Sequence, residues 1–326
     1  MNNERKGMFV IVKILLSFIP LLFGMPTISL ILCACNIAAA AIFFGSFSAV
    51  VASVSAVLFS MLGYGMLFPA GELQGLFVGI EAVACGITAV FVILNRKNFY
   101  EGVWLSSISY LAVNSLNMYQ LSSEEGVSIA QYLTNLPIEL AREQFGALFK
   151  ESGVSMEILE NIIAVLEKYF VMIIPSVLVL SSVFIGYAVM WGSCALLRRT
   201  PFAYEHSFAC IRIPRVSVAI MVLSLVFWII SMGTDVEYIL VNILFIFAGL
   251  AFFAGLSLAE FFLRRAVKNP FLRIVIHIAV YTTFSAFMYI SPYVNIFVIY
   301  IVAASADAFF NFRKLADKSR GDVNEE

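Results

Sequence analysis

Five polar residues lie inside or at the ends of long apolar stretches in the first half of this sequence. They are Glu81, Asn114, Asn117, Asn36 and Tyr110. A carboxylate with amides and an aromatic ring nearby can hold a cationic or hydrogen-bonding ligand. We therefore take these five as candidate substrate-binding residues. The alternative is that Glu81 is held by hydrogen bonds between helices or is protonated.

A second polar group lies near the end of the sequence and consists of His277, Asp307, Glu260 and Arg313. If the apolar stretches 271–290 and 292–312 form an antiparallel helical hairpin, His277 and Asp307 lie at similar depth. Asp307 could then accept a hydrogen bond from His277 or pair with Arg273 or Arg313, while Glu260 could pair with Arg264. The group is expected to act either as a proton relay or as an ion-paired anchor that fixes helix register.

No catalytic or metal-binding motif accompanies these residues. The sequence contains neither HExxH nor GxxxxGK[ST], and it has only two histidines. Zinc peptidases and P-loop enzymes require these motifs for metal ligation and phosphate binding. The sequence therefore predicts no enzymatic activity, no catalytic residue, no metal ligand and no cofactor, and an ATP-driven role would need a partner protein.

The elements that position these residues are apolar helices. Hydrophobic residues make up 62% of the 326 residues and charged residues 13%, whereas soluble domains are about 45–50% apolar. This excess requires lipid as the solvent, which excludes cytosolic and nucleic-acid-binding proteins. Runs of about 20 apolar residues predict an all-α, polytopic membrane protein with about ten transmembrane helices. The runs lie at 8–24, 27–46, 48–70, 73–94, 102–120, 169–197, 216–232, 236–262, 271–290 and 292–312.

The basic residues predict the orientation of these helices. Threading ten spans from a cytoplasmic start places most of the 20 Lys and Arg residues in inner segments, as the positive-inside rule expects. Both termini are then cytoplasmic, and the protein is a multi-pass protein of the cell membrane. The first two spans either cross fully or form a re-entrant hairpin.

This threading also predicts the domain organisation. The chain divides into a five-span bundle at 1–120, an acidic extracytoplasmic helical segment at 121–168, a second five-span bundle at 169–314 and a polar cytoplasmic tail at 315–326. Small residues at Ser48, Ala52 and Ala56 recur every four positions and form a smooth helix face. Such a face favours close helix packing, either within the chain or against a partner subunit.

Several stretches of the sequence resemble a known family. They include IRIPR before the seventh span and the ending ASADAFFNFRK, with Asp307, Arg313 and Lys314. In these stretches the chain resembles the YybS family of uncharacterised polytopic membrane proteins of Gram-positive bacteria. Its first part is also distantly similar to the substrate-binding subunits of energy-coupling-factor transporters. That similarity implies solute binding at the outer face and docking onto a shared energising module.

Two functions are expected on these grounds. The first is a transport-related membrane protein with an outward-facing pocket for a small solute in the first bundle and no energising domain of its own. The second is a non-transporting scaffold or regulatory protein that acts through membrane-protein partners. The lipid bilayer is an expected partner in both cases, and nucleic acid is not.

Overall fold

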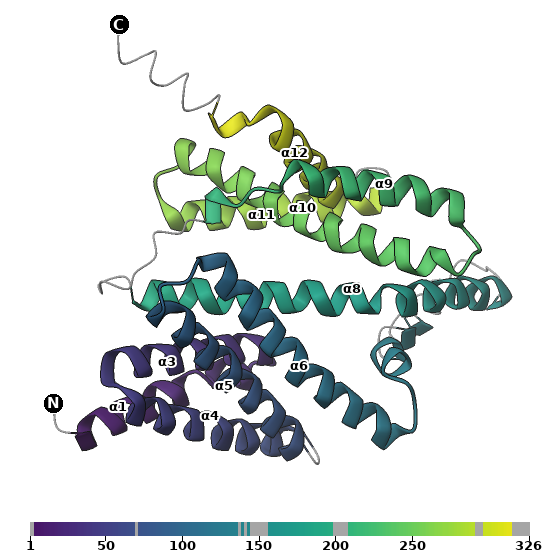
Figure 1. Cartoon of the computed structure of the whole chain (residues 1–326). Helices are drawn as coiled ribbons and strands as arrows, with labels where there is room; N and C mark the ends of the chain where they lie inside the picture. Colours follow the sequence, from purple (N-terminus) through teal and green to yellow (C-terminus); the bar gives the residue numbers. More distant parts are fainter. Residues whose placement is uncertain are drawn as a thin grey trace, which may run out of the picture. The chain divides into compact units, whose positions relative to one another are not determined.

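The computed structural model of the chain is helical throughout the part that it describes, with no strand there (Figure 1). The described residues are 3–68, 71–135, 138–139, 142–143, 156–197, 208–290 and 296–314. The all-α prediction is thus confirmed. The predicted polar tail at 315–326 and part of the acidic segment at 121–168 lie outside the described residues.

Among the described residues, five helices are long and apolar enough to cross a bilayer. They are α3 (Pro26–Phe44), α4 (Ser46–Leu67), α5 (Glu72–Leu94), α8 (Met156–Leu196) and α10 (Val236–Ala266). The other predicted spans fall on α1 (Asn3–Leu16) with α2 (Ile19–Leu22), α6 (Phe99–Glu125), α9 (Arg215–Ser231), α11 (Pro270–Ile290) and α12 (Ile296–Phe310). Each predicted span therefore overlaps a helix within the described residues, and the number of helices that cross the membrane stays a prediction.

The chain forms two compact units. Unit 1 comprises Met1–Ile174 and Leu178–Glu205, and unit 2 comprises Pro175–Val177 and His206–Glu326. Most of α8 belongs to unit 1, where Ile185, Val189 and Met190 are buried in the same core as residues of α3, α5 and α6. The packing units therefore divide after this apolar helix, while the predicted five-span bundles divide before it.

Helices of unit 1 approach closely because small residues line their contacts. Gly45 joins α3 to α4 at φ +87°, a conformation that side chains disfavour, so the two helices reverse over a single residue. At Gly79 of α5, an added Cβ would lie 2.7 Å from the Cα of Val57 in α4. The small residues Ala52 and Ala56 are fully buried in this unit, which favours their role in internal packing.

Helix α8 is longer than a bilayer requires. Its 41 residues extend for about 60 Å at 1.5 Å per residue, about twice the thickness of the hydrocarbon core. The last part of the predicted acidic segment, where Leu159 and Ile163 are buried, is the first part of this same helix. The sequence predicts the acidic segment and the span at 169–197 as separate elements, because glutamates near Lys168 interrupt the apolar pattern. They do not interrupt the backbone hydrogen bonds of the helix.

In unit 2 the central element is α10, which contacts α9, α12 and the short helix η1 (Phe208–Cys210). Ala251 and Ala254 of α10 pack with Ala304 of α12 in the core of this unit. At Gly255 of α10, an added Cβ would overlap the carbonyl oxygen of Tyr300 in α12. Small residues thus bring α10 and α12 into backbone contact and set the depth of the polar groups on both helices.

Candidate functional site

Glu81 is the most unusual polar residue of unit 1. It lies in the interior of α5, and only 3% of its surface is exposed. Its Oε1 atom has no hydrogen-bond partner among the described residues. Tyr64 of α4 and Tyr110 of α6 lie close enough to interact electrostatically with it. A buried carboxyl oxygen without a hydrogen-bond partner is costly, so Glu81 is a candidate site residue of this unit.

The register of α5 against α6 places the predicted amides relative to Glu81. Thr88 and Ser109 share a hydrogen bond of 3.0 Å between their hydroxyls, and Gly102 packs against Val92 further along the pair. These contacts show that α5 and α6 run antiparallel. By this register, Glu81 is level with the stretch of α6 around Asn114, and Tyr110, about one turn earlier in α6, is close enough to interact with it electrostatically.

The structure therefore brings three of the five predicted residues to within about one turn of the same level of the bundle: Glu81, Tyr110 and Asn114. Asn114 and Asn117 are both buried in α6, with 6% and 8% of their surfaces exposed. Asn117 lies about one turn beyond Asn114. The buried face of α6 is thus polar along this stretch, although the helix side exposed at Leu116 and Tyr119 is apolar and aromatic.

Asn36 lies elsewhere in unit 1. Its Nδ2 donates a hydrogen bond of 2.9 Å to Ser17 Oγ, and Ser17 Oγ donates one of 2.9 Å to the carbonyl of Lys13. Helices α3 and α5 are parallel, and Gly86 of α5 meets Ala34 in α3. Asn36 is therefore more than a turn beyond the level of Glu81, and the two residues face different neighbours.

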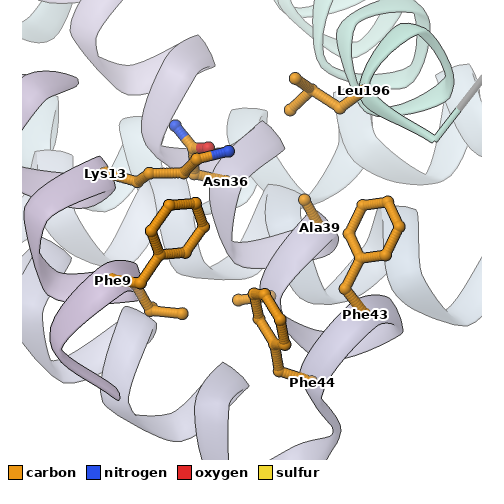
Figure 2. Close-up of a pocket in the computed structure, with 9 residues that line it drawn as sticks. Phe9, Lys13, Asn36, Ala39, Phe43, Phe44 and Leu196 are labelled. Atoms are coloured by element: carbon orange, nitrogen blue, oxygen red, sulfur yellow. The ribbon is translucent and has the colours of Figure 1, made fainter. Parts of the chain in front are cut away.

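A pocket of about 260 Å³ opens beside Asn36 (Figure 2). Three helices line this pocket. Helix α1 contributes Phe9, Val10 and Lys13, α3 contributes Asn36, Ala39, Ala40, Phe43 and Phe44, and α8 contributes Leu196. Figure 2 shows the Lys13 and Asn36 side chains at one end of this pocket and the phenylalanine rings along it. Glu81 is not among its lining residues, so the polar groups of unit 1 form two separate sites.

In unit 2, Glu260 is the centre of a polar cluster. Its Oε1 lies 2.7 Å from Arg264 Nε and 2.8 Å from Arg273 Nη1, and its Oε2 lies 3.2 Å from His277 Nε2. The predicted pair of Glu260 with Arg264 is confirmed. Two of the three alternatives predicted for Asp307 are wrong, because His277 and Arg273 of α11 both pair with Glu260 of α10 instead.

Asp307 pairs with Arg313, which was one of its predicted partners. Asp307 Oδ2 lies 3.2 Å from Arg313 Nε, and the two side chains are 4% and 1% exposed. Arg313 also donates hydrogen bonds to the carbonyls of Ala209 and Ala254, the second at 3.5 Å. Burial lowers the pKa of Arg313, but an arginine remains charged, so Asp307 and the carbonyl oxygens must compensate this charge.

These contacts fasten the segment around η1 to the helices of unit 2. Ser257 Oγ of α10 lies 2.6 Å from the carbonyl oxygen of Phe208 and 3.0 Å from that of Ile211. The side chain of Arg215 donates bonds of 3.0 and 3.2 Å to the last carbonyls of α12, at Ala308 and Phe309. The arrangement is that of an anchor that joins chain segments distant in sequence.

Sequence reasoning missed the roles of Ser257 and Arg215, and it did not identify Glu260 as the common partner of three groups. The spacing of Glu260 and Arg264 by four residues was the available signal.

His277 also lines an apolar pocket of about 380 Å³ with Phe208, Leu256, Ile278 and Tyr300. No group of three or more potential metal ligands exists among the described residues.

Comparison with known proteins gives one match. Residues 7–299 match the model of a family described as "Predicted membrane protein (DUF2232)". No curated protein matches the chain, and no solved structure matches it. The match covers both units and includes all the predicted site residues except Asp307 and Arg313.

Proposed function

The chain belongs to the DUF2232 family of predicted membrane proteins, and from this premise we propose that it is a transport-related protein whose unit 1 binds a small solute at Glu81. The observation that carries the proposal is the buried Glu81 carboxylate without a hydrogen-bond partner among the described residues. Ionisable groups inside membrane proteins are rare and commonly belong to solute or ion pathways.

The chemistry around Glu81 favours a cationic or hydrogen-bonding solute. The carboxylate would accept hydrogen bonds from the solute, the Tyr110 ring offers an aromatic face, and Asn114 offers an amide at the same level. The proposal assigns binding to these residues and no catalysis. Asn117 would extend the polar surface by one turn of α6.

The proposed orientation places this site in the outer half of the membrane. With both termini cytoplasmic, α5 begins at the outer surface. Glu81 lies nine residues after Glu72, which corresponds to about 14 Å along the helix axis. A site at this depth suits uptake of a solute from outside, as in the substrate-binding subunits of energy-coupling-factor transporters. The similarity to those subunits stays a prediction, and so does the resemblance to the YybS family.

The test is ligand-dependent stabilisation of the purified protein. Melting temperature is measured across a panel of vitamins, amines and metal ions for the wild type, Glu81→Gln and Glu72→Gln. Glu72 is an exposed carboxylate at the start of the same helix and serves as the matched control. We expect a solute that stabilises the wild type and Glu72→Gln and fails to stabilise Glu81→Gln. Equal stabilisation of all three proteins, or none by any solute, would contradict the proposal.

A further inference from the structure

We propose that the pocket beside Lys13 and Asn36 binds the anionic head group of an amphiphile, with the start of the apolar chain along the phenylalanine rings (Figure 2). This site shares no lining residue with the Glu81 site and does not depend on the function proposed there. The inference uses the charge of Lys13, the hydrogen bonds of Asn36 and the composition of the pocket wall.

Lys13 supplies an uncompensated positive charge. It lies near the end of the apolar helix α1, and no acidic side chain pairs with it in the part of the chain that the structure describes. Its ammonium group lies 4.9 Å from the centroid of the Phe9 ring, which stabilises a cation only modestly. The Lys13 side chain is exposed, so an anionic ligand can reach its ammonium group and form a charge-assisted hydrogen bond with it.

Asn36 supplies a second donor in a fixed position. One N–H of its amide is used by Ser17, and Ser17 is held in turn by the carbonyl of Lys13. This chain of hydrogen bonds ties the amide of α3 to the backbone of α1. The second amide N–H and the ammonium group of Lys13 can then donate to oxygens of one anion, either a phosphate or a carboxylate.

The remaining wall of the pocket is apolar. Phe9, Phe43 and Phe44 provide aromatic surface, and Ala39 and Ala40 leave room between them. The volume of about 260 Å³ is close to the lower end of ligand pockets, which begin at about 300 Å³. It therefore suits a head group and the first part of a chain whose remainder lies in the bilayer. A free inorganic anion would leave this apolar wall unused.

The test is a titration of the purified full-length chain in a neutral detergent, with melting temperature as the readout. The probes are dioctanoyl phosphatidylglycerol, octanoate, dioctanoyl phosphatidylcholine and inorganic phosphate. We expect stabilisation by phosphatidylglycerol or octanoate beyond that by phosphatidylcholine, and the stronger of the two identifies the head group as phosphate or carboxylate. Equal stabilisation by phosphatidylcholine or by inorganic phosphate alone would overturn the proposal.

Three variants locate the binding. Lys13→Gln should weaken the apparent affinity by about tenfold, as expected for the loss of one charge-assisted contact. Lys13→Arg keeps the charge and should keep most of the binding, which guards against a folding defect at this position. Lys168→Gln is the matched control, since the Lys168 ammonium group also lies over an aromatic ring, 5.8 Å from the centroid of Tyr169, but outside the pocket. Unchanged affinity in Lys13→Gln, or an equal loss in Lys168→Gln, would show that the pocket does not bind the anion.

Discussion

Replacing Arg313 by alanine should destabilise unit 2 strongly. The substitution leaves the Asp307 carboxylate buried without its cation, and Oδ1 of Asp307 already has no hydrogen-bond partner among the described residues. It also removes donors from the carbonyls of Ala209 and Ala254. Breaking a buried ion pair from one side costs about 3–5 kcal/mol, and we expect a loss of unfolding free energy in this range.

The assay is equilibrium unfolding in mixed micelles, followed by far-ultraviolet circular dichroism. Lys314→Ala is the matched control, because the neighbouring Lys314 is exposed, and its cost should stay within about 0.5 kcal/mol. The double variant Asp307→Leu with Arg313→Met should recover most of the stability, since it removes both charges together. The reasoning is refuted if Arg313→Ala costs no more than Lys314→Ala, or if the double variant is less stable than Arg313→Ala.

Three further outcomes are expected. Gly79→Val should prevent close packing of α4 and α5 and lower the melting temperature, because a Cβ at Gly79 meets the backbone of α4. Gly7→Ala should change the melting temperature little, because a Cβ at Gly7 meets open space. Ser257→Ala should cost about 1–3 kcal/mol of unfolding free energy, because it removes the one hydroxyl donor that the carbonyls of Phe208 and Ile211 share. Ser305→Ala loses only a bond within its own helix and should cost less, and equal costs would be inconsistent with the anchoring role of Ser257. Reporter fusions within 121–168 should be active only outside the cytoplasm, and cytoplasmic activity there would show that the predicted orientation is inverted.

Helix locations could be predicted because apolar composition and span length suffice for them. Within the described residues, every predicted apolar stretch overlaps a helix, from 8–24 with α1 and α2 to 292–312 with α12. The continuity of one helix across two predicted segments could not be predicted in the same way. The sequence separates the acidic segment from the following span, yet α8 runs through both, because a helix needs only its own backbone hydrogen bonds to continue. Pro175 lies inside this helix and does not end it.

The candidate sites show the same division. Glu81, Tyr110 and Asn114 could be grouped from sequence because neighbouring antiparallel helices bring equal depths together. Asn36 could not be placed, since its neighbour is Ser17 of the chain before α2 and not a residue of α5 or α6. Depth alone does not say which face of a helix a side chain occupies.

The sequence by itself determined that this protein is helical, belongs in lipid and carries few charges at membrane depth, because these properties follow from composition and from the length of apolar runs. Only the tertiary structure decided which charges meet. His277 pairs with Glu260, and Asp307 pairs with Arg313, although the sequence also allowed a hydrogen bond between His277 and Asp307. The physical reason is that ion pairs act over a few ångströms, and the rotation and approach of each helix are set by small residues such as Gly255, whose contacts arise only when the helices pack.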